Sequence, residues 1–444
     1  MKQQPLTYYF IGIGGVGMSA LARLFLLEGN TVFGYDRVCS RVTLELEQEG
    51  IPIIYQDSVE AMFPEVLETR TQIIYTAAIP ANHPQLCYFI ESEFSVKKRA
   101  VFMAELCNGK KSLAVAGTHG KTTTSAFLTY IFSETKQSFT SIMGGFFQNS
   151  SSNLIRTGSD FMLVEADEYD RSFLHLHPTF GAITSIDADH LDVYQTREVF
   201  EETFAAFSSQ VSQQLIVAYG LPFEGLTYGI EVDADYRIYN VKCLKVGYQF
   251  DLTTPSEKFT HIKLNQLGEH NLSNMLCAIA VADQAGIPIG SALKAMDSFP
   301  GVHRRMNLFE WNDKLLIDDY AHHPTEIKSV LKTLETFYSA HRKCVIFQPH
   351  LFTRTQDFYD EFLAVLSEFD EVVLLDIYPA RELPVAGITS ARMIEDLDHP
   401  CKKLIDKSMV LKTVVESKAS VFALLGAGDI GEEIQLLKSK LVIK

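Results

Sequence analysis

Three segments of the chain repeat one local pattern: a short apolar run leads into a glycine-rich turn and then into a helical run. The first turn is Gly12-Ile-Gly-Gly-Val-Gly17, the second is Gly117-Thr-His-Gly120 and the third is Gly426-Ala-Gly428. Apolar runs at 7–13, 113–116 and 421–425 precede them. Alternation of strands and helices predicts parallel sheets covered by helices.

The length of 444 residues is too great for one ordinary core and indicates two to four domains. Further apolar runs at 31–35, 72–75, 161–165, 182–186, 315–319, 343–347 and 372–378 predict strands, and helices are expected at 270–284 and 324–337. Residues 215–265 are rich in β patterns and predict a small side sheet. We therefore expect three consecutive α/β domains, at 1–108, 109–301 and 302–444.

Composition excludes several classes of protein. The formal net charge is −16, so we expect no binding to nucleic acid or to an anionic membrane surface. Seven scattered cysteines without C-x-x-C spacing predict neither a zinc site nor a redox pair, and fit reduced thiols in the cytoplasm. No charged leader with an apolar run opens the chain, and no stretch of about 18 apolar residues is present, so no signal peptide or membrane insertion is expected.

The second glycine turn has the pattern of a phosphate-binding loop. It lies between a predicted buried strand and a helix, where backbone N–H groups and the helix dipole attract phosphate. Lys121 is placed to pair with the β- and γ-phosphates, and the Thr122 hydroxyl to ligate Mg²⁺. The motif is shortened, because Val115 stands where the full form has its first glycine.

Acidic residues follow two of the predicted strands at the edge of the sheet where ligands bind. Glu165 and Glu168 come after one strand, and the segment from Asp187 to Asp192 follows the next. Mg²⁺ prefers few carboxylates together with waters and phosphate oxygens. Glu165 is the first choice as a protein ligand, with His190 second.

The first glycine turn is ambiguous from its residues alone. Gly14, Gly15 and Gly17 follow a strand and open a helix that begins near Met18, and Asp36 stands at the distance suited to a ribose hydroxyl. This fingerprint fits a nicotinamide dinucleotide or another nucleotide diphosphate equally well.

Taken in order along the chain, these motifs resemble the Mur ligases of peptidoglycan synthesis. The matching segments lie at 12–19, 117–124, 165–168, 170–175, 188–192, 268–274, 318–326, 347–350, 353–355 and 426–429. Each segment is short, but together they extend over nearly the whole chain. Within the family, the pattern is most similar to the branch that joins L-alanine to UDP-N-acetylmuramate.

The resemblance implies a Rossmann-like first domain for the UDP-sugar, a central P-loop-type ATPase with a mainly parallel sheet, and a Rossmann-like third domain for the amino acid. ATP would phosphorylate the lactyl carboxylate, and the amine of L-alanine would attack the acyl phosphate, leaving ADP and phosphate. Mg²⁺ or Mn²⁺ is the implied cofactor, and a monomer or homodimer is expected.

The resemblance also implies roles for individual residues. The implied UDP-sugar site comprises Gly14, Gly15, Gly17, Met18, Asp36, Ala78 and Ile79. The implied ATP site comprises Gly117, Thr118, His119, Gly120, Lys121, Thr122, Thr123, His270, Asn271, Asn274, Arg304 and Asp319. His322, His323, His350 and Arg354 would line the amino-acid site, and Thr122, Glu165 and His190 would hold the metal. Lys121, His190, Arg304, His350 and Arg354 are the implied catalytic residues.

Two departures from the family pattern affect the choice of substrate. Leu351 stands directly after His350, where an arginine is common in the alanine-adding branch. Residues 199–206 contain no lysine, although other Mur ligases use a carbamylated lysine in that stretch, and this absence favours the alanine-adding branch. The alternatives are a tripeptide-recycling ligase of the same family, an NAD-dependent oxidoreductase that uses the first turn, and a nucleotide-binding switch protein.

Overall fold

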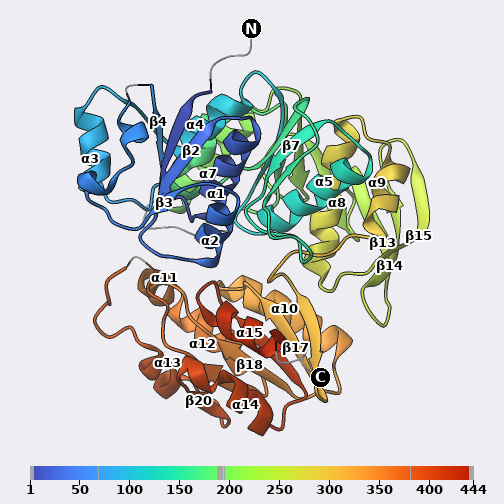
Figure 1. The fold of residues 1–444 in the computed structure, drawn as a ribbon. Helices are drawn as coiled ribbons and strands as arrows, with labels where there is room; N and C mark the ends of the chain where they lie inside the picture. Colours follow the sequence, from blue (N-terminus) through green and yellow to red (C-terminus); the bar gives the residue numbers. More distant parts are fainter. Residues whose placement is uncertain (1–4, 69, 188–193, 195, 381, 440–444) are drawn as a thin grey trace. The chain divides into compact units, whose positions relative to one another are not determined.

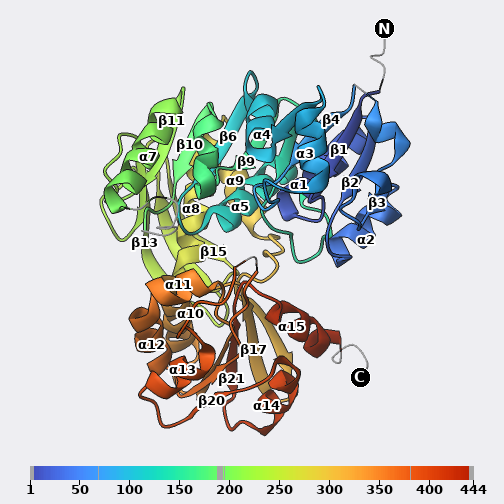
Figure 2. The ribbon, with the colours of Figure 1, turned by 90° about the vertical axis from the view of Figure 1, so that its left-hand side faces the viewer.

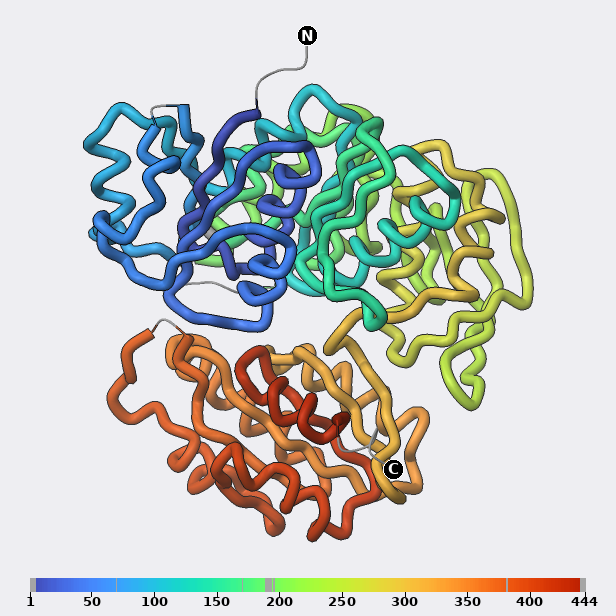
Figure 3. The backbone as a smooth tube through the Cα atoms, in the orientation of Figure 1, coloured from blue at the N-terminus to red at the C-terminus, as the bar shows by residue number. Residues whose placement is uncertain are grey.

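The structure is a computed structural model that describes residues 5–68, 70–187, 194, 196–380 and 382–439. It divides into two compact units, one made of Met1–Tyr236 and Asn274–Pro300, the other of Arg237–Ser273 and Gly301–Lys444. The division falls inside one strand and one helix, and each unit is described by itself. Figure 3 follows the path of the backbone through them.

The first unit begins with a five-stranded parallel sheet of order β3-β2-β1-β4-β5. Its elements are β1 (Thr7–Ile11), α1 (Val16–Leu27), β2 (Thr31–Tyr35), α2 (Arg41–Gln48), β3 (Ile53–Ile54), η1 (Val59–Ala61), η2 (Pro64–Leu67), β4 (Gln72–Tyr75), α3 (Pro84–Glu91), β5 (Ser95–Lys98) and α4 (Arg99–Cys107). Helices α1 and α4 cover one face of the sheet, and α3 covers the other (Figure 1). Strand β1 lies at the centre because its apolar side chains are buried on both faces.

The central part of the first unit is a second sheet, of order β12-β11-β10-β6-β9-β7-β8, parallel except for β8. Its elements are β6 (Lys111–Ala116), α5 (Lys121–Glu134), β7 (Phe139–Ile142), β8 (Leu154–Arg156), β9 (Phe161–Glu165), η3 (Tyr169–His175), β10 (Phe180–Ile183), α7 (Arg197–Gln210), β11 (Gln214–Ala218), β12 (Leu226–Ile230), α8 (Glu269–Gln284) and α9 (Ile289–Met296). Both predicted glycine turns of this unit thus follow a central strand and precede a helix.

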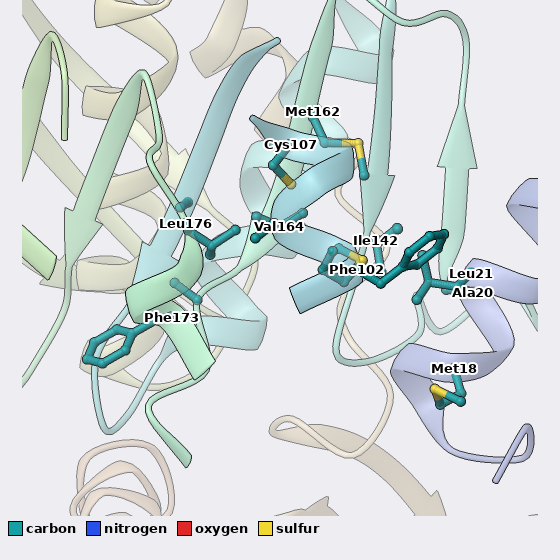
Figure 4. Close-up of a cluster of buried hydrophobic side chains, with 14 of the residues drawn as sticks. Met18, Ala20, Leu21, Phe102, Cys107, Ile142, Met162, Val164, Phe173 and Leu176 are labelled. Atoms are coloured by element: carbon teal, nitrogen blue, oxygen red, sulfur yellow. The ribbon is translucent and has the colours of Figure 1, made fainter. Parts of the chain in front are cut away.

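One hydrophobic core joins these two sheets of the first unit. Figure 4 shows side chains of α1 and α4 gathered with side chains of β7, β9 and η3, and Phe102 and Ile142 are among them. Buried contact of this kind fixes the two glycine turns relative to each other, because protein interiors are close-packed.

The predicted side sheet at 215–265 is only partly correct. Strands β11 and β12 continue the parallel central sheet, because Leu215, Ile216 and Val217 form a buried apolar run. Strands β13 (Tyr236–Cys243), β14 (Tyr248–Thr253) and β15 (Lys258–Leu264) pair antiparallel.

The second unit carries a six-stranded sheet of order β16-β17-β21-β18-β19-β20, parallel except for β16. Figure 2 labels its strands β17, β20 and β21. Its elements are β16 (Asn307–Trp311), β17 (Lys314–Asp319), α10 (Pro324–Phe337), β18 (Lys343–Phe347), α11 (Phe352–Asp357), α12 (Tyr359–Ser367), β19 (Glu371–Leu374), α13 (Ser390–Asp396), β20 (Lys402–Leu404), η4 (Lys407–Met409), α14 (Val410–Glu416), β21 (Val421–Leu425) and α15 (Ile430–Ser439). Helices α10, α12 and α13 pack on one face, and α14 and α15 on the other. The predicted three-domain α/β architecture with mainly parallel sheets is confirmed.

All seven cysteines are free thiols. None of the helices in the described part of the chain is long and apolar enough to cross a membrane.

Candidate active site

The turn between β6 and α5 is held in place by the end of strand β10. The Thr184 hydroxyl donates a hydrogen bond to the His119 carbonyl at 2.5 Å, and the His119 amide donates to Ser185 Oγ at 2.8 Å. Gly117 has a φ of 133°, and a Cβ on it would lie 2.1 Å from Thr184 Oγ1. Gly120 begins α5 in the left-handed region, at φ 83°. Only glycine meets both demands, so these two glycines are required by the backbone path.

Lys121 folds back over this turn and forms a buried ion pair. Its Nζ lies 2.7 and 2.8 Å from the two carboxylate oxygens of Glu168 and donates to the Gly117 carbonyl at 2.6 Å. The Glu168 side chain is only 2% exposed. Burial raises the pKa of Glu168 to about 7, although the ammonium of Lys121 opposes this shift. Burial opposes the charge of Lys121 too, but Glu168 and neighbouring carboxylates raise the pKa of Lys121 above its ordinary value.

Thr122 and Glu165 form the part of the predicted metal site that the structure describes. The Thr122 hydroxyl donates to Glu165 Oε2 at 3.0 Å, and the Gly144 amide donates to Glu165 Oε1 at 2.6 Å. A hydroxyl beside one carboxylate fits Mg²⁺, which takes few protein ligands next to phosphate oxygens. His190 lies outside the described residues. Among those that are described, no three His, Cys, Asp or Glu side chains are grouped to hold a metal ion.

The first glycine turn is tied to the end of β2. The Gly14 amide donates to Asp36 Oδ2 at 2.8 Å, and Asp36 Oδ1 accepts from the Val38 amide at 3.1 Å. Helix α1 starts directly after Gly15. Ile79 lies next to Gly12, where a Cβ would be 3.4 Å from its Cδ1. Asp36 therefore supports the turn, and any ribose contact would use the remaining lone pairs of its carboxylate.

A cavity of about 360 Å³ extends from the first glycine turn to the phosphate loop. It is lined by Gly15, Val16, Gly17, Met18, Thr76, Arg99, Ala100, Met103, Lys121, Ile142, Met143, Gly144, Val164, Glu165, Asp167, Ser172, Phe173 and Leu176. It thus brings together three residues predicted for the UDP-sugar and two predicted for ATP and metal. Of the other predicted UDP-sugar residues, Gly14, Asp36, Ala78 and Ile79 do not line it. Figure 4 labels five of the apolar lining residues within the shared core.

Arg99 is a lining residue that the sequence motifs missed. It is the first residue of α4, and a Cβ on Gly17 would lie 2.4 Å from its Nη1. Its position just after an edge strand belongs to no recognised motif. The only signal was a cation at the carboxyl end of a parallel strand, where ligands bind.

Most of the other residues predicted for the ATP site lie on helices α5 and α8. Thr123 is buried on α5, and Asn274 is buried on α8 with its Oδ1 2.4 Å from the position of a Cβ on Gly120. Asn271 belongs to the second unit, where its Nδ2 donates to the Leu267 carbonyl at 2.7 Å. Burial, with the charge of Arg305, lowers the pKa of His270 to about 4, so this imidazole is neutral. Thr118 donates through its hydroxyl to the Asp187 carbonyl at 2.8 Å.

Arg304 and Asp319 are engaged within the second unit. The Arg304 guanidinium donates to the carbonyls of Gly426 and Gly428 and lies 3.4 Å from Asp318 Oδ1. Asp319 accepts from the amides of Met306 and Ala321 at 2.7 and 2.8 Å. Burial raises the pKa of Asp319 to about 6, with Arg305 opposing. Arg304, the predicted phosphate clamp, already supports the third glycine turn. Asp319, the predicted ribose contact, already supports the backbone at the end of β17.

Three of the four predicted amino-acid residues form a cluster. The rings of His322 and His350 are 6.0 Å apart, His350 stacks on Tyr378 at 5.7 Å, and Arg354 Nη1 lies 3.5 Å from His350 Nδ1. Arg354 is buried.

The fourth, His323, has a structural position. Its Nδ1 accepts from the Thr325 amide at 3.3 Å and caps α10, and its ring packs edge-on against Phe358.

Comparisons with known proteins agree over nearly the whole chain. Three family models match: "Mur ligase family, catalytic domain" over 7–111, "Mur ligase middle domain" over 115–282 and "Mur ligase, glutamate ligase domain" over 304–430. The chain is 45% identical to UDP-N-acetylmuramate–L-alanine ligase of Flavobacterium johnsoniae, with 98% of this chain and 97% of the relative covered. It is 44% identical to the ligase of the same name from Christiangramia forsetii, with 98% and 97% covered.

Solved structures show the same fold. UDP-N-acetylmuramate-alanine ligase of Thermotoga maritima superposes with a TM-score of 0.83 at 26% identity, covering 98% of this chain and 99% of that one. A murein peptide ligase of Psychrobacter arcticus superposes with a TM-score of 0.73 at 21% identity, covering 98% of both chains.

Proposed function

This chain belongs to the Mur ligase family, and we propose that it joins L-alanine to the lactyl carboxylate of UDP-N-acetylmuramate with the use of ATP. The relatives at 44–45% identity are named for this reaction, and the similarity covers nearly their full length. ATP activates the carboxylate as an acyl phosphate, L-alanine displaces the phosphate, and ADP and phosphate leave. The product is a precursor of peptidoglycan.

The observation that carries the proposal is the cavity shared by the two glycine turns. A carboxylate on a UDP-sugar seated at Gly15–Met18 would point along this cavity toward Lys121 and Glu165. Lys121 would stabilise the charge that accumulates on the transferred phosphoryl group. Mg²⁺ or Mn²⁺ would be held by Thr122 and Glu165, with His190 as a further ligand, and would supply charge neutralisation for the phosphates.

The amino acid is assigned to the cluster in the second unit. Arg354 suits the α-carboxylate of L-alanine, because its guanidinium pairs with a carboxylate in a bidentate fashion. His322 and His350 are the candidates for accepting the proton of the amine. Leu351 supplies no charge where related alanine ligases commonly have arginine, so Arg354 would carry the carboxylate contact alone.

Phosphate release under controlled substrate combinations tests the reaction. We expect phosphate from ATP only when UDP-N-acetylmuramate and L-alanine are both present. Phosphate release that needs no amino acid would contradict the ligase, and oxidation of a hydroxy acid with NAD would favour the oxidoreductase instead.

A panel of amine substrates tests the specificity. L-alanine should exceed glycine, L-serine and the recycled tripeptide in kcat/KM. Preference for the tripeptide would replace the assigned substrate but leave the reaction class unchanged.

A further inference from the structure

Arg99 places a guanidinium in the cavity beside the first turn of α1. A Cβ on Gly17 would lie 2.4 Å from Arg99 Nη1 and 3.2 Å from its Cζ, so the absence of a side chain at Gly17 admits this group. The Arg99 side chain is 32% exposed. It thus stands partly exposed at one wall of the cavity, where a ligand can reach it.

The protein itself satisfies this guanidinium poorly. Its ion pair with Asp167 Oδ2 has a separation of 3.8 Å, which is beyond hydrogen-bond distance. Among the described residues, no hydrogen bond from its five N–H donors to a protein acceptor is formed. These donors remain available to a ligand that supplies acceptors.

Lys121 cannot serve the same purpose in the same cavity. Its Nζ is already bound by Glu168 and by the Gly117 carbonyl, next to the turn where phosphate binds. Of the two lining cations, Arg99 is therefore the one with donors to spare.

The other lining residues of the cavity restrict the class of ligand that it can bind. It is apolar at Met18, Met103, Ile142, Val164, Phe173 and Leu176, and its carboxylates at Glu165 and Asp167 repel anions. An anion that enters this space needs a cation at close range.

We propose that Arg99 binds the lactyl carboxylate of the UDP-sugar and holds it facing the phosphate loop. This rests on the proposed function and names a further substrate-binding residue for it. The planar guanidinium donates to both carboxylate oxygens at once, which orients the group for attack on phosphorus. Asp167 is the weakly held counter-ion that the carboxylate displaces. The alternative partner of Arg99 is the diphosphate of the same substrate. The experiment below distinguishes the carboxylate from the diphosphate.

The experiment measures the affinity of UDP-N-acetylmuramate and of UDP-N-acetylglucosamine by calorimetry. The second ligand has the same nucleotide and amino sugar but no lactyl group. We compare the wild type with Arg99→Gln and Arg99→Lys. The matched control is Arg156→Gln, since Arg156 is similarly exposed, at 28%, and pairs with Glu28 away from the cavity.

We expect Arg99→Gln to weaken UDP-N-acetylmuramate by about tenfold to a hundredfold, the range for a charged hydrogen bond, and UDP-N-acetylglucosamine by less than about twofold. Arg99→Lys should fall between Arg99→Gln and the wild type, because one donor of the pair is kept. Arg156→Gln should match the wild type for both ligands.

Equal weakening of both ligands by Arg99→Gln would overturn the proposal, because the guanidinium would then serve the diphosphate. Unchanged affinity for UDP-N-acetylmuramate in both Arg99 variants would overturn it as well. A wild-type protein that binds neither nucleotide sugar would contradict the proposed function itself and this inference with it.

Discussion

At the scale of residues, the charge balance around Lys121 decides how the phosphate loop meets a nucleotide. Its ammonium is held by Glu168 at 2.7 Å. A phosphate group that pairs with Lys121 would therefore compete with the charge of Glu168. Two predictions follow from this contact, one for each partner.

Lys121→Ala should abolish ligation while UDP-sugar binding stays nearly intact. The change removes the cation that, in the proposed function, faces the transferred phosphoryl group, and losses of this kind reduce kcat by at least about a hundredfold. Phosphate release and calorimetric titration with UDP-N-acetylmuramate measure the two effects separately. An equal loss of UDP-sugar affinity would mean that the two glycine turns have been assigned the wrong ligands.

Glu168→Gln should bind ADP more tightly than the wild type, by roughly threefold to tenfold, because the amide keeps the shape of the carboxyl but not its charge. Burial sets the pKa of Glu168 at about 7, so its competing charge appears as pH rises from 6 to 8. The wild type should therefore bind ADP more tightly at pH 6 than at pH 8, and this difference should be absent in Glu168→Gln.

Titration of ADP at pH 6, 7 and 8 in both proteins measures this difference and cancels the protonation of ADP itself. Glu105→Gln, which alters an exposed pair with Lys97, is the control and should follow the wild type. Weaker ADP binding in Glu168→Gln at every pH would show that Glu168 supports the loop rather than competing for Lys121.

At the scale of elements, helix ends were predicted well where the chain carries a local signal. The predicted helix 324–337 has these bounds in the structure, since Pro324 fits a first turn and His323 and Glu326 form a capping box. That same cap engages Nδ1 of His323, and its amino-acid role stays a prediction. The strand predicted at 372–378 ends at Leu374, where the parallel pairing of β19 with β18 stops; the residues beyond it include the charged Asp376.

Glu326→Ala should lower the stability of the second unit by about 1 kcal/mol. Its carboxylate accepts from the amides of His322 and His323 at 2.9 and 3.3 Å, and alanine leaves both donors without that partner. For a unit of this size, the expected fall in Tm is about 2–4 °C. Scanning calorimetry measures it, with the exposed Glu335→Ala on the same helix as the control. An unchanged Tm would show that water caps α10 equally well.

At the scale of the whole molecule, three α/β domains were predictable because each strand, turn and helix is signalled locally. The grouping of 237–273 with the C-terminal residues was not predictable, since it depends on contacts between distant parts of the chain. Arg99 was missed for the same reason. Its position in the cavity is defined by its neighbours Gly17 and Asp167, which are 82 and 68 residues away along the sequence. The motifs predict a ligand for each turn, whereas tertiary packing forms the cavity between the turns.

Because both glycine turns lie in the first unit, UDP-N-acetylmuramate should stabilise that unit selectively. A ligand at about 100 times its Kd adds about 2.7 kcal/mol to the free energy of unfolding, which raises Tm by roughly 5 °C or more. Calorimetry of the intact chain should show one transition that moves with UDP-N-acetylmuramate and another that does not. Glu326→Ala identifies the second, because it lowers only the transition of the unit that contains α10. If the ligand and the variant both shifted one single transition, the two units would unfold together. The expectation of two separate unfolding transitions would then be wrong.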